Sequence, residues 1–119
     1  FTQIYNADGL NQYDYSTINY TSVRGIVFET MLKEPDVLIL DCRNKSSYDN
    51  GHIEGAISFP MNEVKNNLNK IPDKNKKLLL YCNIGTASSR TAQELTSLGY
   101  TEIYNTIDGV AEYPFKLAK

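Results

Sequence analysis

Short runs of hydrophobic residues alternate along the chain with longer segments in which hydrophobic positions recur at helical spacing. Residues 37–40 and 78–81 are hydrophobic at every position, which is typical of strands buried on both faces of a sheet. Shorter strands are predicted at 18–20, 57–59 and 102–104. This alternation indicates an α/β domain with parallel strands.

Helices are predicted between these strands. We expect Ser22 to cap one helix, whose apolar face carries four residues, Val23, Ile26, Val27 and Met31. A longer helix is expected to begin at Ser88 and to end at Gly99, and its apolar positions are Ala92, Leu95 and Leu98. A helical turn at 46–50, a helix at 61–68 and a short C-terminal helix after 108–109 complete the pattern.

Composition narrows the classes of function. The chain has 119 residues, the length of one domain, of which 41% are hydrophobic and 22% charged. The formal charge is −2 and no run of Lys or Arg exceeds two residues, so we expect no nucleic-acid partner. The apolar runs are far shorter than the ~20 residues that a membrane span needs. We therefore expect a soluble, single-domain monomer without a transmembrane span.

Metal and cofactor chemistry find no support in the residue types. Two cysteines and one histidine are too few for a four-ligand structural zinc site. The chain also contains no glycine-rich phosphate loop and no dinucleotide-binding motif. We expect no metal and no cofactor.

The chain divides into a polar, tyrosine-rich extension at 1–17 and a domain at 18–119. It begins at Phe1 and not at Met, and both removal of a signal peptide and excision from a longer protein account for this. Cytoplasmic and exported locations are therefore both compatible with the sequence.

Cys82 is the strongest candidate for a reactive residue. It follows directly on the predicted strand at 78–81, and the next predicted helix begins at Ser88. A loop this short, with Gly85 in it, directs several backbone N–H groups at one point beside the positive end of a helix. Such donors stabilise a thiolate and an anion bound near it. The alternative is an ordinary buried cysteine that packs as a small hydrophobic residue.

Two separated motifs resemble those of rhodanese-like domains. The first runs from Asp41 to Pro60 and matches the signature D-x-R…[YF]-x-x-G-H-I-x-G-A-x-x-x-P. The second begins at Tyr81 and resembles the active-site loop, in which Gly85 stands three positions after the cysteine. Shorter matches follow at 98–100 and 108–110, so that the resemblance covers about residues 18–114. It implies a rhodanese-like α/β fold, with a five-stranded parallel sheet flanked by helices on both faces.

The resemblance also implies a sulfurtransferase. Cys82 would take sulfur from a sulfane donor, such as thiosulfate, a persulfide or a polysulfide, and hold it as a persulfide for a thiol or cyanide-like acceptor. The implied substrate-binding loop consists of Asn83, Ile84, Gly85, Thr86, Ala87 and Ser88. Many thiosulfate-using relatives carry Arg or Lys in this loop, whereas the nearest cation here is Arg90. We therefore expect the donor to be a persulfide or polysulfide.

Three other functions are compatible with the same residues. Phosphatases and arsenate reductases of this fold use a Cys-x5-Arg loop that clamps an oxyanion, but Ser88 stands at that sixth position here. A non-catalytic sulfur carrier or protein-interaction module would keep the loop without turnover. A thiol–disulfide switch would join Cys42 and Cys82, as the related phosphatases also carry a cysteine within D-x-R.

Asp41, Arg43 and His52 of the first motif are expected to support the site, and Cys42 is expected to lie beside it. Asp41 and Arg43 are predicted to form a packed charge pair that fixes the local structure supporting the active site. The resemblance assigns His52 a structural role in orienting the following loop, and a catalytic pair with Cys82 would require spatial reach. Cys42 is a possible redox partner of Cys82, or a small residue that fills an apolar slot.

Overall fold

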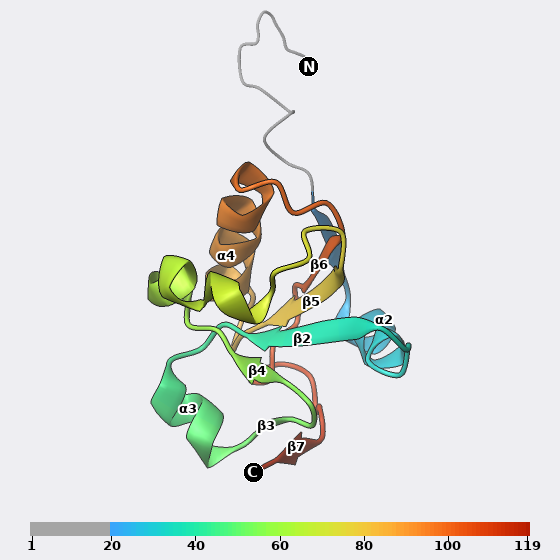
Figure 1. Ribbon diagram of the computed structural model, residues 1–119. Helices are drawn as coiled ribbons and strands as arrows, with labels where there is room; N and C mark the ends of the chain where they lie inside the picture. The colour runs from blue at the N-terminus through green and yellow to red at the C-terminus, as the bar shows by residue number, and fades with distance from the viewer. Residues whose placement is uncertain (1–19) are drawn as a thin grey trace, which may run out of the picture.

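The computed structural model describes residues 20–119, and the predicted extension at 1–17 lies outside them. Five parallel strands form one sheet in the order β1-β6-β5-β2-β4 (Figure 1). The strands are β1 (Thr21–Val23), β2 (Val37–Asp41), β4 (Ile57–Ser58), β5 (Lys77–Tyr81) and β6 (Ile103–Thr106). The short strands β3 (His52–Ile53) and β7 (Leu117–Ala118) pair antiparallel in a second sheet. The predicted five-stranded parallel sheet is confirmed.

The helices are α2 (Gly25–Met31), α3 (Lys45–Asn50), the 3₁₀ helix η2 (Met61–Lys70) and α4 (Thr86–Ser97). None of the helices within residues 20–119 has the length and hydrophobicity required to cross a bilayer. Within the same residues, no group of three or more His, Cys, Asp or Glu side chains is placed to hold a metal ion.

The two central strands supply both faces of the core. β2 and β5 pair in register from Val37 opposite Lys77 to Asp41 opposite Tyr81. Because successive side chains of a strand point to opposite faces, each strand contributes to two hydrophobic clusters. One cluster lies under α4 and η2 and includes Leu40, Leu80, Val64 and Leu95. The other lies under α2 and the C-terminal segment and includes Ile39, Leu79, Phe28 and Phe115. Helices therefore cover both faces, as predicted.

The predicted helix at 22–31 is wrong in its start and in part of its buried face, although Met31 is buried as predicted. Residues 21–23 form β1, and α2 begins only at Gly25. Ile26 and Val27 are 65% and 46% exposed, whereas Phe28 and Met31 face the core. The start is fixed from a distance, because the Gly25 N–H donates a 2.9 Å hydrogen bond to the Asp108 carboxylate. The spacing of hydrophobic residues near Gly25 could not predict a hydrogen bond to a residue so distant in sequence. Of the predicted strand at 18–20, only Tyr20 lies within the described residues, just before β1.

The helix that follows the active-site loop also begins elsewhere than predicted. Gly85, not Ser88, is its N-cap, in a left-handed conformation with φ of +93°, and α4 starts at Thr86. Ser88 is fully buried within the first turn. The hydroxyl that would cap the helix lies instead 3.4 Å from the sulfur of Cys82. The predicted Gly99 end is close to the observed one, since α4 ends at Ser97 and Gly99 has a φ of +98°.

The C-terminal segment differs from the predicted helix. Residues 109–113 form turns, and the chain then runs to β7, which pairs Ala118 with His52 and Leu117 with Ile53. The turn at 46–50 is confirmed as α3, which the Asn44 side chain caps by accepting from the Ser47 N–H. The predicted helix at 61–68 is present as η2, although its backbone is interrupted at Glu63.

Candidate active site

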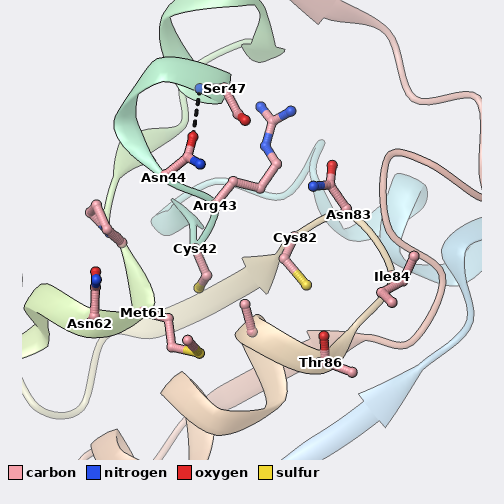
Figure 2. Close-up of a pocket in the computed structure, with 12 residues that line it drawn as sticks. Cys42, Arg43, Asn44, Ser47, Met61, Asn62, Cys82, Asn83, Ile84 and Thr86 are labelled. Carbon is pink, nitrogen blue, oxygen red and sulfur yellow. Dashed lines mark hydrogen bonds between the residues drawn. The ribbon is translucent and has the colours of Figure 1, made fainter.

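A pocket of about 450 Å³ opens at the carboxyl ends of β2 and β5 (Figure 2). Its lining comes from three segments, residues 42–47, 60–62 and 82–87. Open parallel sheets bind their ligands at this edge, where the loops after the strands converge. Cys42, Arg43 and most of the predicted substrate-binding loop therefore line the same pocket as Cys82.

The Cys82 sulfur lies in a cradle of hydrogen-bond donors. It accepts from the backbone N–H of Gly85 at 3.1 Å and from that of Ser88 at 3.4 Å. The Ser88 hydroxyl accepts from the Cys82 thiol at 3.4 Å and donates to the Gly85 carbonyl at 3.4 Å. Both N–H groups belong to the start of α4, whose helix dipole presents partial positive charge at that end. The cradle therefore suits a negatively charged sulfur at this position, the thiolate of Cys82.

A turn that is distant in sequence fixes the shape of this loop. The N–H groups of Val110 and Ala111 donate to the carbonyls of Cys82 and Asn83 at 2.9 and 3.0 Å. Gly109 passes so close that a Cβ there would lie 2.2 Å from the Cys82 carbonyl oxygen. A Cβ on Gly85 would lie 2.8 Å from the carbonyl oxygen of Ile107. The 107–111 turn is thus a structural part of the site, and its only signal in the sequence is the motif match at 108–110.

Asp41 and Arg43 form the charge pair that their spacing indicated. The Arg43 guanidinium donates to both carboxylate oxygens of Asp41, with distances of 3.0 and 2.7 Å, and also to the Gly51 carbonyl at 2.6 Å. The Tyr81 hydroxyl donates to Asp41 at 2.7 Å and accepts from the Ile53 N–H at 3.0 Å. Hydrogen bonding to Asp41 raises the pKa of Arg43, and burial raises the pKa of Tyr81. This network locks the ends of β2 and β5 together.

The pocket offers amides in place of free cations. Figure 2 shows the Arg43 guanidinium directed toward α3, whereas the Cys82 sulfur points toward α4. The charge of Arg43 is balanced by the fully buried Asp41. Among the described residues, no other Arg or Lys than Arg43 lines this pocket, and its polar side chains include Asn44, Asn62 and Asn83.

Cys42 is the neighbour of Cys82 across the sheet. The Cys42 N–H donates a 2.9 Å hydrogen bond to the Tyr81 carbonyl, which continues the β2–β5 ladder by one residue. Both cysteines are 2% exposed, belong to the same hydrophobic cluster and are unpaired thiols. In Figure 2 both side chains point to the α4 side of the strands. Burial raises the pKa of the Cys42 thiol, which is therefore held as the neutral thiol.

His52 does not reach the pocket. Its ring stacks on Tyr48 with a centroid distance of 3.9 Å, and its Nδ1 lies 2.9 Å from the Tyr48 carbonyl. The Tyr48 hydroxyl in turn donates to the Ala56 carbonyl at 2.7 Å. The histidine therefore belongs to the packing that shapes the 51–56 loop, and the pocket residues do not include it.

Known proteins with this sequence pattern point to one family. Residues 27–114 match the family model described as Rhodanese-like domain. Thiosulfate sulfurtransferase PspE of Escherichia coli is 37% identical over 67 residues, which cover 56% of this chain and 64% of that protein. A tRNA uridine(34) hydroxylase of Hamiltonella defensa is 33% identical over 88 residues, covering 70% of this chain but 25% of that protein. A second such hydroxylase, of Escherichia fergusonii, is 28% identical over 116 residues, which cover 92% of this chain but 33% of that protein.

Solved structures agree with the sequence relatives. A structure described as a rhodanese with anions from E. coli superposes with a TM-score of 0.62 at 32% identity, covering 70% of this chain and 98% of that one. The Alr3790 protein of Anabaena superposes with a TM-score of 0.72 at 24% identity over 81% of both chains, which supports the fold. With the match over residues 27–114, these likenesses establish that the chain belongs to the rhodanese-like domain family.

Proposed function

We propose that the protein is a sulfurtransferase that forms a persulfide on Cys82. The observation that carries the proposal is the donor cradle, in which the N–H groups of Gly85 and Ser88 both meet the Cys82 sulfur. Backbone donors directed at one sulfur favour its anionic form. A thiol that is already ionised needs no general base to remove its proton. The position of His52 outside the pocket is consistent with such a base-free reaction.

The first half-reaction loads the enzyme. The Cys82 thiolate attacks the outer sulfur of the donor, a new S–S bond forms, and the S–S bond within the donor breaks. With a persulfide donor R–S–SH the leaving group is the thiolate R–S⁻, and with thiosulfate the leaving group is sulfite. Charge is conserved in both cases, and no external oxidant takes part.

The second half-reaction transfers the sulfur from Cys82 to the acceptor. An acceptor thiolate attacks the outer sulfur of the Cys82 persulfide and becomes a persulfide itself. The S–S bond to Cys82 breaks, and its electron pair returns to the Cys82 sulfur as a thiolate. The cradle stabilises that leaving group with the same two N–H groups, so one arrangement serves both half-reactions.

The charge of the pocket favours a persulfide or polysulfide donor over thiosulfate. A dianion requires cations that are not already paired, and Arg43 is paired with Asp41. The amide side chains of Asn44, Asn62 and Asn83 suit a donor that carries less charge. The similarity to Thiosulfate sulfurtransferase PspE supports sulfur transfer as the reaction. The preference for a persulfide or polysulfide donor is inferred from the pocket of this chain.

A phosphatase or arsenate-reductase reaction has weaker support. That chemistry needs an arginine at the sixth position after the cysteine to clamp the oxyanion. Ser88 occupies this position and is fully buried beside the Cys82 sulfur. Arg90, the next cation along the chain, does not line the pocket.

The experiment is steady-state turnover with an alkyl persulfide as donor and a thiol as acceptor. We expect turnover in the unaltered protein and in Cys42→Ser, and loss of turnover in Cys82→Ser. Thiosulfate should be used at least tenfold less efficiently, as one missing charge-assisted contact costs about that factor. No turnover with any sulfane donor would overturn the enzymatic proposal in favour of a carrier or interaction module.

A second function, a thiol–disulfide switch, is favoured by the register of the two cysteines. Neighbouring strands lie ~4.8 Å apart, within the ~7 Å of Cα separation that a disulfide spans. With a peroxide as oxidant, Cys82 would become a sulfenic acid as the O–O bond breaks and its second oxygen leaves as water. The Cys42 thiol would then displace the sulfenic oxygen as a second water and form the disulfide.

A further inference from the structure

A second cavity lies on the other side of the active-site loop. It measures about 540 Å³ and is lined by residues from β1, β6, the loop and the first turns of α4. We call it the rear cavity and define it by Ser22, Gly85, Ser89, Arg90 and Asn105, with Ile84, Thr86 and Ile107 at its edge. Cavities of this volume hold small organic ligands.

One buried polar group of the rear cavity has no hydrogen-bond partner in the part of the chain that the structure describes. Asn105 stands in β6, opposite Ser22 of β1 and Leu80 of β5, and is 1% exposed. Its side-chain carbonyl oxygen accepts no hydrogen bond within residues 20–119. A buried amide oxygen without a donor costs free energy, which a ligand N–H or O–H would recover.

Arg90 gives the rear cavity a positive charge that no carboxylate within residues 20–119 pairs with. Arg90 is exposed and forms no ion pair with a carboxylate among the described residues, in contrast to Arg24 and Arg43. A guanidinium in this position is suited to a carboxylate, which it can bind through two parallel hydrogen bonds. The hydroxyl of Ser89 is already engaged with that of Tyr20 at 2.8 Å, which holds the α4 side of the cavity against the start of β1.

The rear cavity adjoins the catalytic pocket. Ile84 and Thr86 line both cavities, so that only the edge of the loop separates them. Ile84 is 54% exposed and Ile107 is 42% exposed, which gives this edge an apolar surface. A molecule anchored in the rear cavity could therefore extend over the loop toward the sulfur of Cys82.

We propose that the rear cavity binds the carboxylate-bearing end of a small peptide-like thiol, the acceptor of the sulfur held on Cys82. Arg90 binds the carboxylate, the Asn105 oxygen accepts from an N–H of the ligand, and the thiol end reaches across Ile84. The inference rests on the proposed sulfurtransferase function and names its acceptor class. The transfer is the attack of the acceptor thiolate on the outer sulfur, with Cys82 leaving as the thiolate.

The kinetic test compares glutathione, which carries carboxylates and N–H donors, with the neutral 2-mercaptoethanol. Arg90→Gln should raise the KM for glutathione about tenfold, the value of one charge-assisted hydrogen bond, and should shift the KM for 2-mercaptoethanol less than twofold. Arg90→Glu should in addition lower the KM for the cationic thiol cysteamine. Lys33→Gln, an exposed charge change at the end of α2, is the matched control and should change neither KM. Equal effects of Arg90→Gln on both thiols would overturn the proposal.

A binding test separates this inference from the proposed function. S-methylglutathione cannot accept sulfur, so its NMR titration reports binding without reaction. We expect chemical-shift changes at Ser89, Arg90 and Asn105, and their loss in Arg90→Gln and in Asn105→Ala once thermal unfolding shows that each variant is folded. Shifts confined to the residues of the catalytic pocket would overturn the rear site while leaving the sulfurtransferase intact. Failure to load Cys82 with sulfur would overturn the proposed function, and with it the acceptor role of the cavity.

Discussion

The backbone N–H of Cys42 donates a 2.9 Å hydrogen bond to the carbonyl of Tyr81, which sets Cys42 beside Cys82 at the ends of adjacent parallel strands. Both thiols are buried in the same cluster beneath α4. The site therefore combines a cradled nucleophile with a second sulfur held neutral by burial.

Mild oxidation should join the two cysteines. After treatment with hydrogen peroxide, we expect the intact mass to fall by two hydrogens, because the thiol of Cys42 displaces the sulfenic oxygen of Cys82. Reduction with dithiothreitol should restore the mass and the turnover. In Cys42→Ser, the same treatment should add oxygen atoms at Cys82. Addition of oxygen atoms in the unaltered protein as well, without loss of hydrogens, would contradict the switch.

Removal of the Asp41 carboxylate should destabilise the domain strongly. Asp41→Ala removes the carboxylate that balances the charge of Arg43, whose side chain is 8% exposed, and that accepts from the Tyr81 hydroxyl; the guanidinium keeps its hydrogen bond to the Gly51 carbonyl. Loss of one partner of a buried ion pair costs about 3–5 kcal/mol of unfolding free energy, measured by urea denaturation. The matched control is Asp49→Ala, which removes the exposed pair with Lys45 and should cost less than about 1 kcal/mol. Similar losses in both variants would contradict the structural role of Asp41.

Gly109 should be required for the shape of the active-site loop. An alanine Cβ there would lie 2.2 Å from the Cys82 carbonyl oxygen, so the loop or the 107–111 turn must move. We expect Gly109→Ala to lower turnover at least tenfold, because a displaced N–H donor no longer meets the sulfur. Gly99→Ala is the control. Its φ of +98° makes it strained by ~1–3 kcal/mol, but its Cβ meets only the Lys74 side chain at 3.6 Å. Equal activity losses in the two variants would argue against a specific role for the turn.

Stability should fall in alkaline solution through Cys42. Burial raises its pKa above the ordinary value of 9.0, so the folded protein keeps the proton that the unfolded chain releases. The contribution of Cys42 is therefore complete below about pH 9 and decreases as the pH rises above it, by at most ~1.4 kcal/mol per pH unit. Urea denaturation between pH 8 and pH 10.5, a range on either side of that ~9 value, should show a shallower decline in Cys42→Ala. Identical slopes in the two proteins would contradict this titration.

The regions that the sequence predicted correctly are those governed by local pattern. The hydrophobic runs at 37–40 and 78–81 form β2 and β5, and the two motifs place Cys82 and the pair of Asp41 and Arg43 at one edge of the sheet. Helix position proved less predictable where distant groups set it. The start of α2 depends on Asp108, and Ser88 turns inward to the Cys82 sulfur and does not cap α4.

Contacts between distant segments account for what the sequence did not indicate. The support of the loop by the 107–111 turn depends on backbone hydrogen bonds, which residue types do not encode. The pairing of β7 with β3 replaced the expected C-terminal helix for the same reason. The rear cavity combines β1, β6 and α4, and the strand predicted at 102–104 ends before Asn105.

The role of Cys82 as the sulfur carrier is best tested by the intact mass of the reduced protein after exposure to an alkyl persulfide and removal of small molecules, before any reductant is added. We expect a gain of one sulfur atom that a thiol acceptor removes, that persists in Cys42→Ser and that is absent in Cys82→Ser. An unchanged mass, or a sulfur that remains bound in Cys82→Ser, would contradict the assignment of Cys82 as the sulfur-carrying nucleophile.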